Sequence, residues 1–170
     1  MHPGLEFFTA TCLNWQPLLA EEKHKQIVLE SLEFLVKEER IWLYGYVLMP
    51  NHLHLLWRKQ DAWIDKSVQQ QFLKFTAQMI KFNMINNFPQ ELQNYRSTQA
   101  DRAYHFWERR PYKATMMDRS VLEEKLDYMH DNPVKAGLRS MPEDYQYSSA
   151  GFYLNNIDEL NILTHYMEHM

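Results

Sequence analysis

The feature that most constrains the fold is a strongly strand-forming run that is interrupted once by a Pro50-Asn51 turn. Residues 41–57 are rich in aromatic, leucine and β-branched side chains around this turn, which predicts a β-hairpin. His52 and His54 open the second strand, and because successive side chains of a strand point to opposite faces, both imidazoles share one face. Two half-exposed histidines at a strand end would give the same pattern. In this rigid setting, however, the pair predicts a site for one divalent cation.

Hydrophobic periodicity orders the rest of the chain around this hairpin. A strand and an amphipathic helix precede it, and a longer helix and further strands follow it. The expected elements are a strand at 5–13, a helix at 21–39, the hairpin at 41–57, a helix at 66–85, a fourth strand at 104–108 and a possible fifth at 112–116. This β-α-β-β-α-β order predicts an α+β, ferredoxin-like or RRM-like sandwich, in which a central antiparallel sheet carries helices on one or both faces.

The helix expected at 66–85 carries apolar side chains at intervals of three or four residues, which predicts that this side of the helix faces the core. These side chains are Val68, Phe72, Phe75, Met79 and Phe82. The polar segment 86–99 that follows predicts a loop with a helical turn.

Composition bounds the class of protein. The chain has 170 residues, of which 45% are hydrophobic, enough for one well-filled core and too few for two typical domains. Cys12 is the only cysteine, which excludes zinc fingers and disulfide frameworks, and we expect it to be a buried, reduced thiol in the first strand. The sequence has no secretory signal and no apolar run long enough to span a bilayer, so we expect a cytoplasmic protein that does not engage membranes.

A tyrosine and an asparagine form a second candidate constellation far along the chain. Ser120 and Glu123 make a capping-box pattern at the start of a helix that Pro133 is expected to end. Tyr128 and Asn132 are four residues apart, so both project from nearly the same face of that helix. Taken alone, the pattern favours a structural role, with the tyrosine along a core groove and the asparagine as a cap at the helix end.

A basic segment with interleaved aromatic residues predicts contacts to nucleic acid, because arginine and lysine bind phosphates and aromatic rings stack on unpaired bases. The candidates are Arg102, Trp107, Arg109, Arg110, Lys113 and Arg119, with Lys135 beyond them. Alternatively, Trp107 belongs to the core and the arginines form a solvated rim. The formal net charge of −4 argues mildly against tight non-specific binding, and the acidic side chains concentrate on the helix at 21–39.

Both motifs together resemble a known family. Residues 47–57 with His52-Leu53-His54, and the later run 128–138 beginning Tyr128-Met129-His130-Asp131-Asn132-Pro133, are similar to the HUH-type single-tyrosine transposases. Within these, the chain looks most like the REP-associated tyrosine transposases of the insertion-sequence-200-like superfamily. The resemblance covers roughly residues 6–150, which it implies form an HUH catalytic domain, with residues 151–170 as a C-terminal tail packed on the same domain.

The resemblance implies a DNA-strand-cleaving and joining enzyme that acts on single-stranded or hairpin DNA as a monomer or homodimer. Tyr128 would become linked to a 5′ phosphate, and His52, His54 and Asn132 would hold Mg²⁺ or Mn²⁺. Two imidazoles and one amide oxygen suit these ions better than a closed zinc site does. His130 lies two residues after the tyrosine, on a different side of the helix, which argues against a catalytic role.

Two other functions remain open from the residues. One is a catalytically silent protein that binds DNA hairpins, which the net negative charge favours mildly. The other is an unrelated, small metal-dependent hydrolase built on His52 and His54.

Overall fold

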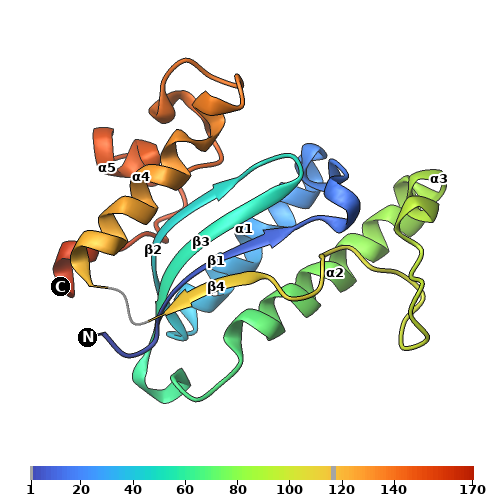
Figure 1. Cartoon of the computed structure of the whole chain (residues 1–170), viewed down its shortest axis with the longest axis horizontal. Helices are drawn as coiled ribbons and strands as arrows, with labels where there is room; N and C mark the ends of the chain where they lie inside the picture. The colour runs from blue at the N-terminus through green and yellow to red at the C-terminus, as the bar shows by residue number, and fades with distance from the viewer. Residues whose placement is uncertain (1, 116–117) are drawn as a thin grey trace.

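A four-stranded antiparallel sheet is the centre of the fold. The computed structural model describes residues 2–115 and 118–170, and within these ranges the sheet has the strand order β2-β3-β1-β4 (Figure 1). Its strands are β1 (Leu5–Thr11), β2 (Ile41–Leu48), β3 (His52–Lys59) and β4 (Tyr112–Thr115). This is the predicted ferredoxin-like order, with β1 and β3 in the middle and β2 and β4 at the edges.

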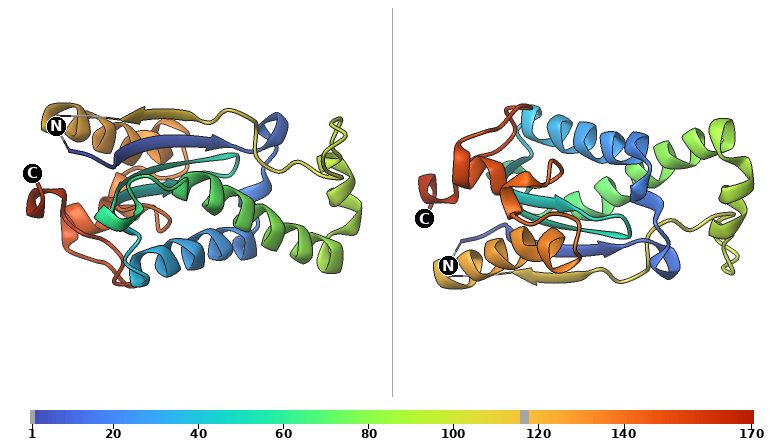
Figure 2. Two further views of the ribbon diagram at one scale, coloured as in Figure 1. Left: turned by 90° about the horizontal axis from the view of Figure 1, so that it is seen from below. Right: turned by 90° about the horizontal axis from the view of Figure 1, so that it is seen from above.

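Helices cover both faces of the sheet (Figure 2). The helices of the described residues are α1 (Glu22–Lys37), α2 (Val68–Asn87), the short α3 (Pro89–Leu92), α4 (Arg119–Lys135) and α5 (Ala150–Asn155). α1 and α2 lie on one face, and α4 crosses the other. No helix among the described residues has the length and apolar character needed to cross a membrane.

Alternation along the strands gives each face its own core. Phe8 on β1 and Leu55 on β3 point toward α1 and α2 in one hydrophobic cluster. Phe7 and Leu56, their neighbours in sequence, join Leu126 of α4 in the other cluster. Because the histidines of β3 have the same parity as Leu56, they lie on the α4 face.

The fourth strand is Tyr112–Thr115, and the prediction of a strand at 104–108 is wrong. Residues in that segment form only isolated bridges, and their backbone partners come from different parts of the chain. His105 N donates to Tyr95 O, whereas Glu108 N donates to Thr11 O, so no continuous ladder can form. Met116, the expected last residue of the final strand, lies outside the described residues.

The predicted core face of α2 is correct only at Val68 and Phe72. Phe75 is 54% exposed, and Met79 and Phe82 are exposed as well. The buried row instead follows four-residue steps from Val68 to Met84 through Thr76 and Ile80. Thr76 can occupy the core because its hydroxyl donates to Phe72 O and accepts the indole N–H of Trp107, so both of these side-chain groups are paired.

α4 begins and ends at other residues than the sequence predicts. Asp118, not Ser120, caps the helix, and its side chain accepts a hydrogen bond from Val121 N at 2.9 Å. The helix continues through Pro133, whose ring removes one N–H donor without stopping the chain. It ends at Lys135, with Ala136 as the C-cap, and Gly137 follows with a φ of +75°, the left-handed conformation that closes many helices. Tyr128 and Asn132 therefore lie within one continuous helix.

The last twenty residues pack against the open edge of the sheet at β2. Tyr153 of α5 donates its hydroxyl to Tyr44 O at 2.7 Å, and the Tyr44 hydroxyl contacts His169 Nδ1 at 2.8 Å.

Cys12 is buried just beyond the end of β1, and burial raises the pKa of its thiol to about 12.

α4 approaches β2 so closely at Gly45 that no side chain fits between them. A Cβ built on Gly45 would lie 2.6 Å from Leu126 Cδ2 and 3.3 Å from Met129 Sδ, both buried. We therefore expect Gly45→Ala to lower the free energy of unfolding by about 1–3 kcal/mol, because overpacking pushes α4 off the sheet. Urea unfolding measures this change.

Gly151 offers a matched control for the same substitution. An added Cβ there meets no atom within 4 Å, and the residue lies in α5. Gly151→Ala should leave stability unchanged or raise it by up to about 1 kcal/mol. Equal effects of the two substitutions would contradict the close approach of α4.

Candidate active site

The two predicted motifs meet on the α4 face of the sheet. His52 and His54 of β3 lie beside β1, paired with Thr11 and Thr9, and α4 passes over them. The helix brings Tyr128 to the same place. A pocket of about 460 Å³ lies there, and side chains from β1, β3, β4 and α4 line it: Phe7, Thr9, His52, His54, Tyr112, Lys125, Tyr128 and Asn132, with Trp15 from the turn after β1.

Hydrogen bonds to Nδ1 fix the orientation of both histidine rings. His54 Nδ1 contacts Thr9 Oγ1 at 2.7 Å, and His52 Nδ1 contacts Asn51 Oδ1 at 2.7 Å. The ring centroids are 4.9 Å apart, and the Nε2 atoms are left for other partners. His52 Nε2 lies 3.1 Å from Asn132 Oδ1. This arrangement, with Nδ1 held by a neighbouring oxygen and Nε2 left for another partner, is the usual one for metal-binding histidines.

His54 Nε2 is a buried polar atom without a hydrogen-bond partner among the described residues. His54 is almost fully buried, and leaving such an atom unpaired costs about 1–3 kcal/mol. A cation bound beside His52 Nε2 and Asn132 Oδ1 would satisfy it. These donors therefore fit a divalent metal ion.

Both imidazoles are held neutral, as metal ligation requires. Burial, with His52 and Lys125 nearby, lowers the pKa of His54 to about 3. Burial also lowers the pKa of His52, although its contact with Asn132 opposes this shift. Metal ions bind neutral imidazole, so neither ring needs to lose a proton at pH 7.

Within the described residues, no three His, Cys, Asp or Glu side chains cluster as a metal site. The Asn132 carboxamide, whose Oδ1 lies 3.1 Å from His52 Nε2, could serve as a third protein ligand beside the two imidazoles. A set of two imidazoles and one amide leaves several coordination positions for water and phosphate oxygens.

Tyr128 presents an accessible hydroxyl at the rim of the pocket. Its side chain is 47% exposed, and its ring centroid lies 5.3 Å from that of His54. Lys135, one turn beyond Asn132, places its ammonium 5.8 Å from the Tyr128 ring centroid. The phenol thus lies beside the candidate metal ligands with a positive charge nearby.

His130 is not part of this site. Its Nε2 contacts Ser149 Oγ at 2.7 Å on the side of α4 that faces away from the histidine pair. Burial lowers the pKa of His130 to about 4, so the ring is neutral at pH 7. Its position two residues after Tyr128 makes it a packing residue, as the sequence favoured.

Trp15 lines the pocket and was missed by sequence reasoning. It is 61% exposed, its ring centroid lies 5.8 Å from that of His52, and it adopts a φ of +56° directly after Asn14 at +55°. Two successive non-glycine residues in the left-handed region are strained, and such strain is concentrated at functional sites. Nothing in the sequence around Trp15 signals this conformation.

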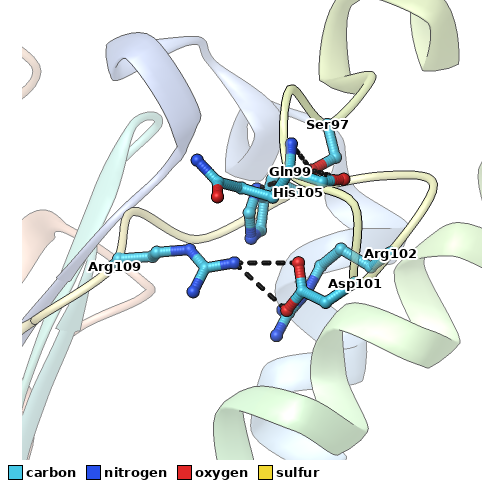
Figure 3. Close-up of polar contacts among 6 residues, drawn as sticks. All are labelled: Ser97, Gln99, Asp101, Arg102, His105 and Arg109. Carbon is cyan, nitrogen blue, oxygen red and sulfur yellow. Dashed lines mark hydrogen bonds and ion pairs between the residues drawn. The ribbon is translucent and has the colours of Figure 1, made fainter.

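The structure divides the predicted basic patch between two places. Arg102, Arg109 and Lys113 lie around a groove beside α2, whereas Arg119 and Lys135 are on α4. Arg109 and Arg102 both pair with the exposed carboxylate of Asp101, at 3.0 and 3.5 Å (Figure 3).

Arg110 and Trp107, the other two residues of the predicted patch, have separate environments. Arg110 is exposed in the turn before β4, with a φ of +58°. Trp107 is only 7% exposed and its indole N–H donates to Thr76, so the core alternative holds for it and its ring is not free to stack on a base.

Comparisons with known proteins agree with the resemblance that the motifs indicated. No protein-family model matches the chain. Over 104 residues it is 31% identical to a Haemophilus influenzae protein named as a REP-associated tyrosine transposase. That match covers 60% of this chain and 54% of the relative, so the chain matches about half of the relative's length.

The fold is also similar to that of a solved structure. A REP-associated tyrosine transposase bound to a REP hairpin superimposes with a TM-score of 0.67, covering 94% of this chain and 85% of that chain at 16% identity. The chain thus resembles one of these transposases over part of its sequence and another in its α+β fold.

Proposed function

We propose that this protein is a metal-dependent enzyme that cleaves and rejoins DNA strands at single-stranded or hairpin DNA through a 5′-phosphotyrosine. The observation that carries the proposal is the meeting of His52 and His54 on β3 with Tyr128 and Asn132 on α4, in one pocket. The names of the similar proteins support the same activity and a hairpin substrate. A cytoplasmic location and a monomeric or homodimeric state remain predictions.

The reaction begins at the Tyr128 hydroxyl. Its oxygen attacks the phosphorus of a phosphodiester, the bond from phosphorus to the 3′ oxygen breaks, and the 5′ phosphate stays on the tyrosine. The exposed phenol passes its proton to water, and the departing 3′ oxygen takes one up. Lys135 stabilises the phenolate that develops. A 3′ hydroxyl can later attack the phosphotyrosine and release Tyr128, which rejoins a strand.

His52, His54 and Asn132 would hold the divalent cation, with Mg²⁺ and Mn²⁺ favoured by the neutral nitrogen and oxygen donors. Bound there, the cation would neutralise phosphoryl charge and stabilise the leaving 3′ oxygen. Thr9 and Asn51 would keep the two rings oriented. The exposed indole of Trp15 can stack on an unpaired base beside the scissile phosphate.

Tyr128→Phe should abolish the covalent protein–DNA adduct while changing hairpin affinity by no more than about twofold, because only the nucleophilic oxygen is removed. A labelled hairpin with single-stranded flanks, incubated with Mn²⁺ and analysed on denaturing gels, measures the adduct. Tyr112→Phe is the control, since this tyrosine lines the same pocket from β4. An adduct formed by Tyr128→Phe at the wild-type rate would overturn the assignment, and hairpin binding by a wild-type protein that forms no adduct would favour the silent-binder alternative.

Thr9→Val should weaken Mn²⁺ binding by about 10- to 100-fold, because His54 loses the partner that orients its ring. Titration calorimetry without DNA measures this effect separately from catalysis. Thr11→Val is a matched control on the same strand, since the Thr11 hydroxyl has no hydrogen bond to any described residue. Equal Mn²⁺ affinity in the two variants would contradict the site.

Hairpins with single-stranded tails should bind better than perfect duplex, because an accessible aromatic ring contacts only unpaired bases. Trp15→Ala should remove about 1–3 kcal/mol of binding free energy from the tailed hairpin and leave the duplex unchanged. Fluorescence anisotropy at several salt concentrations measures both. Trp15→Phe, which keeps a ring, should retain most of the difference. A uniform loss on tailed hairpin and duplex would argue against stacking.

A further inference from the structure

We propose that the groove between α2 and the segment 101–113 binds the phosphate backbone of an unpaired DNA strand that continues from the active site. This inference rests on the proposed function and extends it to a second binding surface. The basic segment that the sequence predicts to contact nucleic acid forms one wall of this groove, and neither the sequence nor the comparisons assign a role to the other wall, on α2.

The groove has a volume of about 1040 Å³, against about 460 Å³ for the pocket around the histidines. It lies where the chain leading into β4 runs alongside α2 (Figure 1). Seven lysine and arginine side chains line it, against four carboxylates. This local excess of positive charge contrasts with the net charge of −4 for the whole chain. A concave surface with an excess of one sign of charge concentrates the field and attracts ions of the opposite charge.

One wall carries lysines that have no partner in an ion pair with a described residue. Lys74 and Lys81 lie seven residues apart on one side of α2, and Lys66 precedes the helix. Seven residues are two helical turns, about 10 Å, so the two helical lysines form a row along the groove. A row of ammonium groups suits a phosphate backbone of any sequence.

The opposite wall carries Arg102 and Arg109, which share Asp101 (Figure 3). All three side chains are about half exposed, and an ion pair of this kind contributes little stability. A phosphate can therefore take the place of Asp101 at small cost, and it offers the guanidinium groups the geometry they bind best.

His105 supplies an independent sign that the groove receives a ligand. Its side chain lines the groove and is only 7% exposed, and Nδ1 contacts Ser97 Oγ at 3.2 Å. Nε2 is buried without a hydrogen-bond partner among the described residues, an arrangement that is uncommon in folded proteins. Figure 3 shows this ring beside the Arg109–Asp101 pair. A phosphate or sugar oxygen in the groove would satisfy the nitrogen.

Only the edge strand β4 separates the groove from the active site. Lys113 of β4 and Glu6 of β1 line the groove, whereas their neighbours Tyr112 and Phe7 line the pocket around the histidines. The exposed Tyr112 ring lies at this edge. A flexible single strand can pass from Tyr128 over Tyr112 into the groove, while a stiff duplex cannot follow that bend.

The test compares two double variants with the wild-type protein. Lys74→Gln with Lys81→Gln changes the groove, and Lys23→Gln with Lys37→Gln removes the same charge from α1, whose lysines do not line the groove. Each protein is titrated with one hairpin that has ten-nucleotide tails and with the same hairpin without tails. The wild-type and control proteins should bind the tailed probe more tightly.

The groove variant should lose at least about fivefold of this tail advantage, and the slope of log affinity against log salt should fall by about 1.4 for two lost contacts to a single strand. An unchanged tail advantage and salt slope in the groove variant would overturn the inference, as would a wild-type protein that ignores the tails. The adduct assay separates the two claims. If Tyr128 forms the adduct but the lysine substitutions have no effect on tail binding, the groove does not bind the tail and the proposed cleavage activity is retained. If the lysines govern tail binding but no adduct forms, the groove stands and the cleavage proposal fails.

Discussion

The packing of α4 against the sheet is the contact on which the site depends. α4 carries Tyr128 and Asn132, while β3 carries the histidines, and the two elements are joined only through side chains on the α4 face. Gly45 permits the close approach because Leu126 occupies the space that a side chain would fill. A small change in this contact would move the phenol relative to His54 and separate the nucleophile from the metal ligands.

Burial around the histidines serves binding more than stability. A fully buried imidazole with an unpaired Nε2 destabilises the folded chain, and neutral rings in this setting remain able to bind a cation. The strained backbone at Asn14 and Trp15 also costs stability, and it holds an aromatic side chain in solvent next to the pocket. Both features reduce stability at the same place, and a ligand that contacts them would recover part of the loss.

Charge is distributed unevenly over the surface of the protein. The chain is acidic overall, yet the groove beside α2 is locally basic, and the Arg102 and Arg109 side chains are held there by Asp101. The whole-chain charge therefore understates the capacity of one surface to bind phosphates. Binding to that surface would depend strongly on salt.

Periodicity in the sequence predicted the ferredoxin-like sandwich and the side chains that share one face of an element, whereas the meeting of the two motifs was implied by the resemblance to the transposases. Strand alternation places His52 and His54 on one face, and helical spacing aligns Tyr128 with Asn132. Periodicity could not predict features that depend on individual tertiary contacts. Thr76 accepts the indole N–H of the buried Trp107, and the buried row of α2 passes through Thr76 and leaves Phe75 exposed.

The position of Trp15 and the end of α4 are two further features that periodicity in the sequence could not predict. A left-handed turn after β1 and a helix that passes through Pro133 both oppose local propensity. The α2 groove brings together residues from four separate segments, each of which is an ordinary charged surface by itself.

The central claim is that β3 and α4 assemble one metal site beside Tyr128, and anomalous scattering from a crystal soaked in Mn²⁺ tests it most directly. We expect a single strong peak within coordination distance of His52 Nε2, His54 Nε2 and Asn132 Oδ1, and no such peak in a His52→Ala, His54→Ala double variant. A principal peak elsewhere in the molecule, or a peak at this place that persists in the double variant, would contradict it.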